Sequence, residues 1–204
     1  MEVPVKRYAP AAARNRAPLL AVLQRVLPAR GTLLEVASGT GQHAAFFAEA
    51  MPGLVIQPSD PSPEQRASIA AWVADAALPN LRPPLALDVR DPRWPLEEAD
   101  AVLCINMFQV APLDAAAGLF AGAARLLGER GVLLTYGPYR EAGAHTSPGN
   151  EAFDASLRKR HEGWGVRDIE SELVPRARAA GLALSERVAM PAHNLTLVWR
   201  PATS

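Results

Sequence analysis

The sequence has one cysteine, no excess of charge of either sign and no long apolar run. Cys104 has no partner for an internal disulfide, which favours a reducing compartment, and we expect a cytoplasmic protein. The 21 basic and 21 acidic residues cancel, which argues against nucleic acid and membrane surfaces as partners. No segment approaches the length of a membrane span, and residues 1–10 contain no signal-peptide core. Four histidines without ligand spacing predict no metal site.

The length of 204 residues suits one domain, which we expect to span residues 1–204. Residues 1–30 would form an N-terminal unit, with an extended arm over residues 1–13 followed by a first helix. Residues 137–167 are irregular, polar and aromatic, and they follow an apolar run. Long insertions at such positions often act as lids, so we expect a substrate lid there.

Short apolar runs alternate with helical patterns along most of the chain. Strands are predicted near residues 32–36, 54–56, 85–87, 101–105 and 132–136, and helices over 14–27, 113–127, 150–161 and 168–180, with others opening after Gly41 and at Pro63. Alternation of this kind predicts right-handed crossovers and parallel strands. Two further runs, 182–190 and 195–200, share a link too short for anything but antiparallel pairing. The sequence therefore predicts an α/β fold, a doubly wound, mainly parallel seven-stranded sheet with an antiparallel C-terminal hairpin.

The most informative stretch runs from Thr32 to Ala48. An apolar strand that contains Glu35 leads into Ser38-Gly39-Thr40-Gly41, and a helical pattern follows. Glycine permits the unusual φ values of a tight turn and lets backbone N–H groups approach a ligand. The first turn of the helix adds unpaired N–H donors. The stretch is therefore typical of a ligand-binding turn.

Two glycine patterns overlap in this turn. Gly39-x-Gly41-x-x-Ala44 fits the dinucleotide fingerprint, with Asp60 about 20 residues further on. The same residues form E-x-A-x-G-x-G from Glu35, which resembles motif I of class I S-adenosylmethionine-dependent methyltransferases, with Ala37 at the first glycine. A buried acid needs a partner, either a core arginine or the cationic end of a ligand. Glu35 and the terminal hairpin favour the methyl donor over NAD.

A closer resemblance covers nearly the whole chain. Its motifs are Y-x-P-A-A-x-R-N, L-E-V-A-S-G-T-G-Q-H, Q-P-S-D, I-N-M, F-D-x-S-L-R and W-G-V-R-D. Together they resemble a small uncharacterised family of methyltransferase-like proteins that includes methyltransferase-like protein 26. The resemblance implies a class I fold and S-adenosylmethionine as cofactor, without a known substrate.

The resemblance also implies roles for residues that follow the predicted strands. Asp60 would accept hydrogen bonds from the ribose hydroxyls, Asp88 and Val89 would meet the adenine, and Asn106 with Met107 would line the methionine side. Turn or N-cap roles are the alternatives for the three polar residues. The expected cofactor-binding set is Arg14, Asn15, Glu35, Ala37, Ser38, Gly39, Gly41, His43, Asp60, Asp88, Val89, Asn106 and Met107. Arg14 and Asn15 are included because the N-terminal arm could fold over the donor, with Arg14 on its carboxylate. The alternative for these two is a helix start with exposed polar residues.

The acceptor site is less well marked. The expected substrate set is Tyr8, Tyr139, Asn150, Phe153, Arg158 and Trp164. The catalytic residue is not identified, and the candidates for a general base are His145, Asp154 and His161, although a histidine in such a loop is often simply exposed.

We therefore expect methyl transfer to an unidentified small-molecule acceptor. The alternatives are an NAD-type oxidoreductase and a non-catalytic S-adenosylmethionine-binding scaffold for a protein partner. The oligomeric state is left open, a homodimer being one option.

Overall fold

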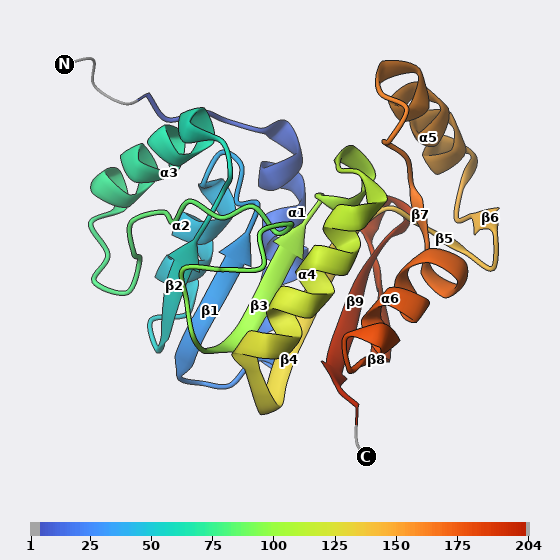
Figure 1. Cartoon of the computed structure of the whole chain (residues 1–204). Coiled ribbons are helices and arrows are strands. Elements are labelled where there is room, and N and C mark those ends of the chain that lie inside the picture. The colour runs from blue at the N-terminus through green and yellow to red at the C-terminus, as the bar shows by residue number, and fades with distance from the viewer. Residues whose placement is uncertain (1–4, 203–204) are drawn as a thin grey trace.

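The computed structural model describes residues 5–202, and its centre is a six-stranded sheet in the order β2-β1-β3-β4-β9-β8 (Figure 1). The strands are β1 (Gly31–Val36), β2 (Leu54–Pro58), β3 (Ala99–Ile105), β4 (Leu127–Gly137), β8 (Leu182–Met190) and β9 (Asn194–Pro201). Strands β1 to β4 pair in parallel, whereas β9 pairs antiparallel with both β4 and β8. The predicted mainly parallel sheet with an antiparallel terminal hairpin is confirmed.

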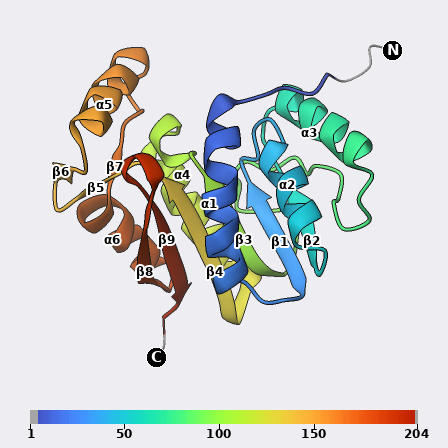
Figure 2. The ribbon, with the colours of Figure 1, turned by 180° about the vertical axis from the view of Figure 1, so that it is seen from behind.

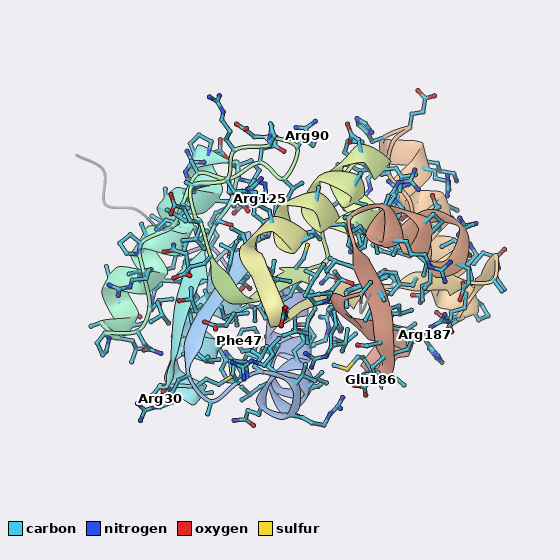
Figure 3. All side chains as sticks on the ribbon, turned by 60° about the horizontal axis from the view of Figure 1, so that its bottom comes forward. Arg30, Phe47, Arg90, Arg125, Glu186 and Arg187 are labelled. Atoms are coloured by element: carbon cyan, nitrogen blue, oxygen red, sulfur yellow. The ribbon has the colours of Figure 1, made fainter. Side chains whose placement is uncertain are left out.

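Helices cover both faces of this sheet. Helices α1 (Pro10–Val26) and α2 (Gln42–Ala50) lie on one face and α4 (Leu113–Leu126) and α6 (Val174–Ala179) on the other, with α3 (Pro63–Ala76) beside α2 (Figures 1 and 2). Figure 3 looks along the sheet, and Phe47 lies on the α1 side, opposite α4. Leu33 and Leu34 are both fully buried because successive side chains of β1 enter opposite cores.

The strand predicted at residues 85–87 is absent. Leu81 and Leu85 form only isolated bridges, to Ile56 and Ser59, so the main sheet of residues 5–202 has six strands rather than seven. The cause is local, because Pro83 and Pro84 have no N–H to donate to a continuous ladder. The segment still follows the edge of β2 and positions the residues after it.

The predicted lid, residues 137–167, is more regular than expected. It contains β5 (Tyr139–Glu141), β6 (Ala144–His145) and α5 (Pro148–Arg160), and β5 pairs with β6 and with β7 (Arg167–Asp168) in a small second sheet. Helix α5 stands at the edge of the molecule beside the β8–β9 link, η3 (Pro191–His193), as Figures 1 and 2 show. Residues 137–167 are therefore a folded element with its own hydrogen bonds, and their role as a lid stays a prediction.

Two helix predictions need correction at their ends. The first helix begins at Pro10, so the extended arm is shorter than residues 1–13, and its residues 1–4 lie outside the described part of the chain. The helix predicted over 168–180 is a π-helical turn, η2 (Ile169–Leu173), followed by α6. Pro175 cannot donate the hydrogen bond that a continuous α-helix needs there. Asp168 caps the N-terminus of this turn, since its Oδ1 accepts from the Ser171 N–H at 2.9 Å.

Across residues 5–202 the helices are all too short or too polar to cross a lipid bilayer.

Candidate functional site

The parallel strands bring the ends of β1, β2, β3 and β4 to one edge of the sheet, where ligands bind in open α/β folds (Figure 1). Residues 37–41 follow β1, Asp60 follows β2, and Asn106 follows β3 at the start of the segment that leads to η1 (Phe108–Val110). The predicted cofactor residues thus come from separate elements that meet at this edge.

The turn after β1 has the geometry that its glycines permit. Ala37, Gly39 and Gly41 have φ values of 53°, 57° and 91°. A Cβ on Gly41 would lie 2.9 Å from the Ile69 Cα, so the close packing of α3 requires glycine there. A Cβ on Gly39 would meet nothing within 4 Å, so the backbone at Gly39 is open on its ligand side. Ala37 adopts the left-handed conformation without being glycine, which costs roughly 1 kcal/mol.

Glu35 lies directly before this turn, and its carboxyl group makes no hydrogen bond or ion pair within residues 5–202. Its side chain is 1% exposed, and neither carboxylate oxygen has a hydrogen-bond partner among the described residues. Burial raises the pKa of Glu35 to about 8. The nearby Ser38 hydroxyl, which donates to the Glu35 main-chain carbonyl at 3.1 Å, opposes the shift, and the carboxylate of Asp60 adds to it. The alternative expected from the sequence, an ion pair with a core arginine, does not form within residues 5–202. Glu35 is an acid that still needs a cation or a donor.

Asp60 ties the turn to β2. Its Oδ2 accepts from the Gly39 N–H at 3.0 Å, and its Oδ1 accepts from the Ser62 N–H at 2.9 Å. Burial raises the pKa of Asp60, and these two amides oppose the shift. Each carboxylate oxygen has a second lone pair, so Asp60 combines the turn role with free acceptor capacity. Ser38 supports the same junction, because its N–H donates to the Ser59 carbonyl at 2.9 Å.

A cavity of about 260 Å³ lies beside the turn. We call it the smaller cavity, and its largely apolar wall includes Val36, Ala37, Leu87, Val89, Met107, Val110 and Ala115. Asp88 lies on its rim and pairs with Arg90, Nη2 to Oδ2 at 2.6 Å, which lowers the pKa of Asp88. Arg90 is on the loop above α4 in Figure 3. The smaller cavity is therefore a narrow apolar slot with one charged edge.

A second cavity, of about 600 Å³, opens on the other side of Val110. We call it the larger cavity, and its walls come from α1, the segment after β3, the end of β4, α5 and the β8–β9 link. Its polar residues are Arg14, Asn15, Asn106, Gln109, Tyr136, Asn150 and Asn194, and its apolar ones are Ala11, Val110, Pro138, Phe153, Pro191 and Ala192. Asn106 has a φ of 55° and its Oδ1 accepts from Gln109 Nε2 at 3.2 Å.

A chain of polar side chains runs behind the larger cavity. His43 Nε2 and Asn15 Oδ1 are 2.7 Å apart, which makes Nε2 the protonated nitrogen. Burial lowers the pKa of His43 to about 4, with Arg16 adding to the shift, so His43 is neutral at physiological pH. The Tyr136 hydroxyl accepts from Asn194 Nδ2 at 3.1 Å and lies beside Asn15. His43 therefore orients Asn15, and it is not among the residues that line either cavity.

Four of the six expected substrate residues make contacts elsewhere. Tyr8 packs edge-on against Trp72, and Tyr139 is buried with its hydroxyl on Thr135. Arg158 pairs with Asp154 four residues earlier, and Trp164 stacks on His161. None of the four lines either cavity, whereas Asn150 and Phe153 line the larger one.

The three candidate bases also lie away from both cavities. Asp154 accepts from the Val166 N–H at 2.7 Å and from Arg158, so it holds α5 to the segment after it. His145 Nε2 lies 3.5 Å from the same carboxylate. His161 accepts from the Gly163 N–H. These side chains therefore make local contacts within residues 145–166.

The sequence analysis missed Gln109, Tyr136 and Asn194. Tyr136 was visible as the last residue of a predicted strand, and Gln109 closes the stretch I-N-M-F-Q. Asn194 gave no signal, since its position depends on β9 lying next to β4. In the described residues no group of three or more His, Cys, Asp or Glu side chains could hold a metal ion.

One protein-family model matches almost the whole chain. A family model described as "Protein of unknown function (DUF938)" matches residues 6–201. The chain belongs to the DUF938 family. That description names no activity, and the narrower resemblance to the family of methyltransferase-like protein 26 stays a prediction.

Solved structures share the fold. CalO1, a methyltransferase in calicheamicin biosynthesis solved in its SAH-bound form, superposes with a TM-score of 0.74 at 21% identity over 92% of this chain and 54% of CalO1. An O-methyltransferase family protein from Burkholderia thailandensis gives 0.78 at 20% identity, over 95% and 58%. NcsB1, an O-methyltransferase from neocarzinostatin biosynthesis in complex with SAM and 2-hydroxy-5-methyl naphthoic acid, gives 0.75 at 16% identity, over 94% and 54%. The DUF938 chain spans about half the length of these proteins and shares their α/β fold.

Proposed function

We propose that this DUF938 protein binds S-adenosylmethionine at the turn after β1 and transfers its methyl group to a small molecule. The observation that carries the proposal is Glu35, a buried acid whose side-chain oxygens have no hydrogen-bond partner within residues 5–202, directly before an open glycine turn. S-Adenosylmethionine has a sulfonium and an ammonium group, and either cation would satisfy such an acid. When bound, the donor supplies a methyl group already activated by its positive sulfur.

The residues around the turn suit the rest of the donor. Asp60 has free acceptor capacity for two ribose hydroxyls. The apolar smaller cavity, beside Ala37, would take the flat adenine between Val89 and Met107. CalO1 and NcsB1 were solved with SAH and SAM, which supports the same donor here.

The larger cavity would take the acceptor. It adjoins the smaller cavity at Val110, so a donor seated at the turn has its reactive end close to the larger cavity. NcsB1 binds a small naphthoic acid, which supports an acceptor of similar size. Neither cavity is lined by a histidine or an unpaired carboxylate that could act as a general base.

Catalysis would therefore come mainly from positioning. Alignment of attacking atom, methyl carbon and sulfur can contribute on the order of 7–11 kcal/mol in favourable cases. The chain's own contribution is to hold the donor by the turn and Asp60, to orient the acceptor with the amides of the larger cavity, and to exclude water with α5.

Calorimetry tests donor binding. Titration with S-adenosylmethionine, S-adenosylhomocysteine and NAD should show binding of the first two only. The Glu35→Gln variant should weaken S-adenosylmethionine binding by about tenfold, because the loss of one charged contact changes affinity by that order. Glu49→Gln, an exposed position on α2, is the matched control and should bind as the unmodified protein does.

Binding of NAD in place of the adenosyl compounds would support the oxidoreductase alternative and overturn the proposal. Binding of S-adenosylmethionine without methyl transfer to any small acid, phenol, amine or thiol would favour the scaffold alternative.

A further inference from the structure

The described residues that line the larger cavity include one basic side chain and no acidic one. Of its thirteen lining residues, Arg14 is the one with a charged side chain. Among residues 5–202, Arg14 has no hydrogen-bond or ion-pair partner. An unpaired guanidinium at the wall of a cavity without acids favours an anionic guest.

Tyr136 offers a donor to the same guest. Its hydroxyl oxygen already accepts from Asn194, and Asn15 is a second polar neighbour. Burial raises the pKa of Tyr136, so the hydroxyl keeps its proton at neutral pH. The proton of that hydroxyl is therefore free to be donated to a guest in the larger cavity, which Tyr136 lines.

Arg14 is an exposed residue of α1 that lines this cavity. No residue from 37 to 41 lines the larger cavity, and its remaining walls include Asn150 and Phe153 of α5 and the β8–β9 link. The sequence analysis assigned Arg14 to the donor's carboxylate. The position of Arg14 among the residues that face an acceptor argues for a different anion.

We propose that the larger cavity binds a small carboxylic acid as the methyl acceptor, with its carboxylate held by Arg14 and the Tyr136 hydroxyl. The inference rests on the proposed function, since it assumes a donor at the turn. The apolar residues Val110, Pro138 and Phe153 would contact the body of the acid. A carboxylate is ionised at neutral pH without help, so its oxygen can attack the methyl carbon with no proton to remove. The new O–C bond forms as the C–S bond breaks, which gives a methyl ester and releases S-adenosylhomocysteine, and this agrees with the absence of a general base among the described lining residues.

The test uses benzoate and its uncharged isostere benzamide, titrated by calorimetry into the full chain with and without saturating S-adenosylhomocysteine. Benzoate should bind the S-adenosylhomocysteine-loaded protein at least about tenfold more tightly than benzamide. Arg14→Gln should remove most of that preference, and Tyr136→Phe should reduce it severalfold. S-Adenosylhomocysteine affinity should change by less than about threefold in both variants.

The control variants are Arg16→Gln and Tyr139→Phe. Arg16 is on the same helix but lies over Phe46, and Tyr139 is buried on Thr135, so neither lines the larger cavity. Both should retain the preference for benzoate, and all four variants should keep the circular dichroism spectrum of the parent.

Three results would overturn the inference. Equal affinity for benzoate and benzamide, or no benzoate binding at millimolar levels, would show that the cavity does not select a carboxylate. A loss of S-adenosylhomocysteine affinity in Arg14→Gln with benzoate binding unchanged would assign Arg14 to the donor. If S-adenosylhomocysteine itself fails to bind, the proposed function fails first, and the titration without it reports separately on the anion site.

Discussion

Glu35 links the stability of the protein to pH. Its pKa of about 8 in the folded chain lies above the ordinary 4.5, so between these values the unfolded chain has lost a proton that the folded chain keeps. The stabilising effect is complete below pH 4.5 and is lost as pH rises toward 8. We expect the free energy of unfolding to fall by roughly 3 kcal/mol more from pH 5 to pH 8 in the parent than in Glu35→Gln, measured by urea denaturation. Parallel pH curves for the two proteins would contradict the assignment.

Substitutions at Gly39 and Gly41 should have different effects, the first mainly on ligand binding and the second mainly on stability. A Cβ at Gly39 would project into open space, so Gly39→Ala should cost only about 1 kcal/mol of left-handed strain while it obstructs the donor. Gly41→Ala adds a contact of 2.9 Å with the Ile69 backbone and should cost about 2–4 kcal/mol. Denaturation and S-adenosylhomocysteine titration of both variants check this. An unchanged affinity of Gly39→Ala for S-adenosylhomocysteine would contradict this prediction.

Some site residues could be predicted from sequence alone and others could not. Glu35 and the turn are encoded locally, by an acid and glycines at fixed spacing at a strand end. Tyr136 obtains its role from Asn15 and Asn194, which are far from it in the chain, and no local pattern contains that contact. His161 was a candidate base and Trp164 a candidate substrate residue, but in the structure the two rings stack on each other.

Helix α4 supports the smaller cavity through a close approach. A Cβ on Gly118 would lie 2.4 Å from the Val89 carbonyl oxygen, on the segment that lines this cavity. We expect Gly118→Ala to displace that segment, to weaken S-adenosylhomocysteine binding by about tenfold and to destabilise the fold by about 1–3 kcal/mol. Gly122→Ala is the comparison, since it meets the Trp94 ring instead. An equal loss of affinity in both variants would argue for general disruption rather than a role of the Val89 segment.

Apolar runs predicted the central strands well, because both faces of these strands are buried. They failed at residues 85–87, where Pro83 and Pro84 interrupt the ladder that an apolar run otherwise predicts. They also failed before Pro175, where a π-helical turn replaces the expected α-helix. In both places a missing proline N–H, rather than hydrophobicity, determines the backbone.

Binding of the donor product should stabilise the entire domain. The proposed site joins the ends of β1, β2 and β3, so unfolding would require release of the ligand. At one hundred times its Kd, S-adenosylhomocysteine should add about 2.7 kcal/mol and raise the Tm by roughly 5–10 °C. Differential scanning fluorimetry measures this, with NAD at the same concentration as the control. A shift with NAD of the same size would contradict selective binding.

Strand β9 lies between β4 and β8, although it comes last among the six strands in sequence. During synthesis, β8 leaves the ribosome before the strand that connects it to the rest of the sheet, so it has no neighbour to pair with in the meantime. The six-stranded sheet can be completed only after the chain has been synthesised as far as Pro201, where β9 ends. Ribosome-stalled chains that end before Asn194 should therefore be sensitive to proteases, and the Tyr136–Asn194 contact is formed only at the final step of assembly.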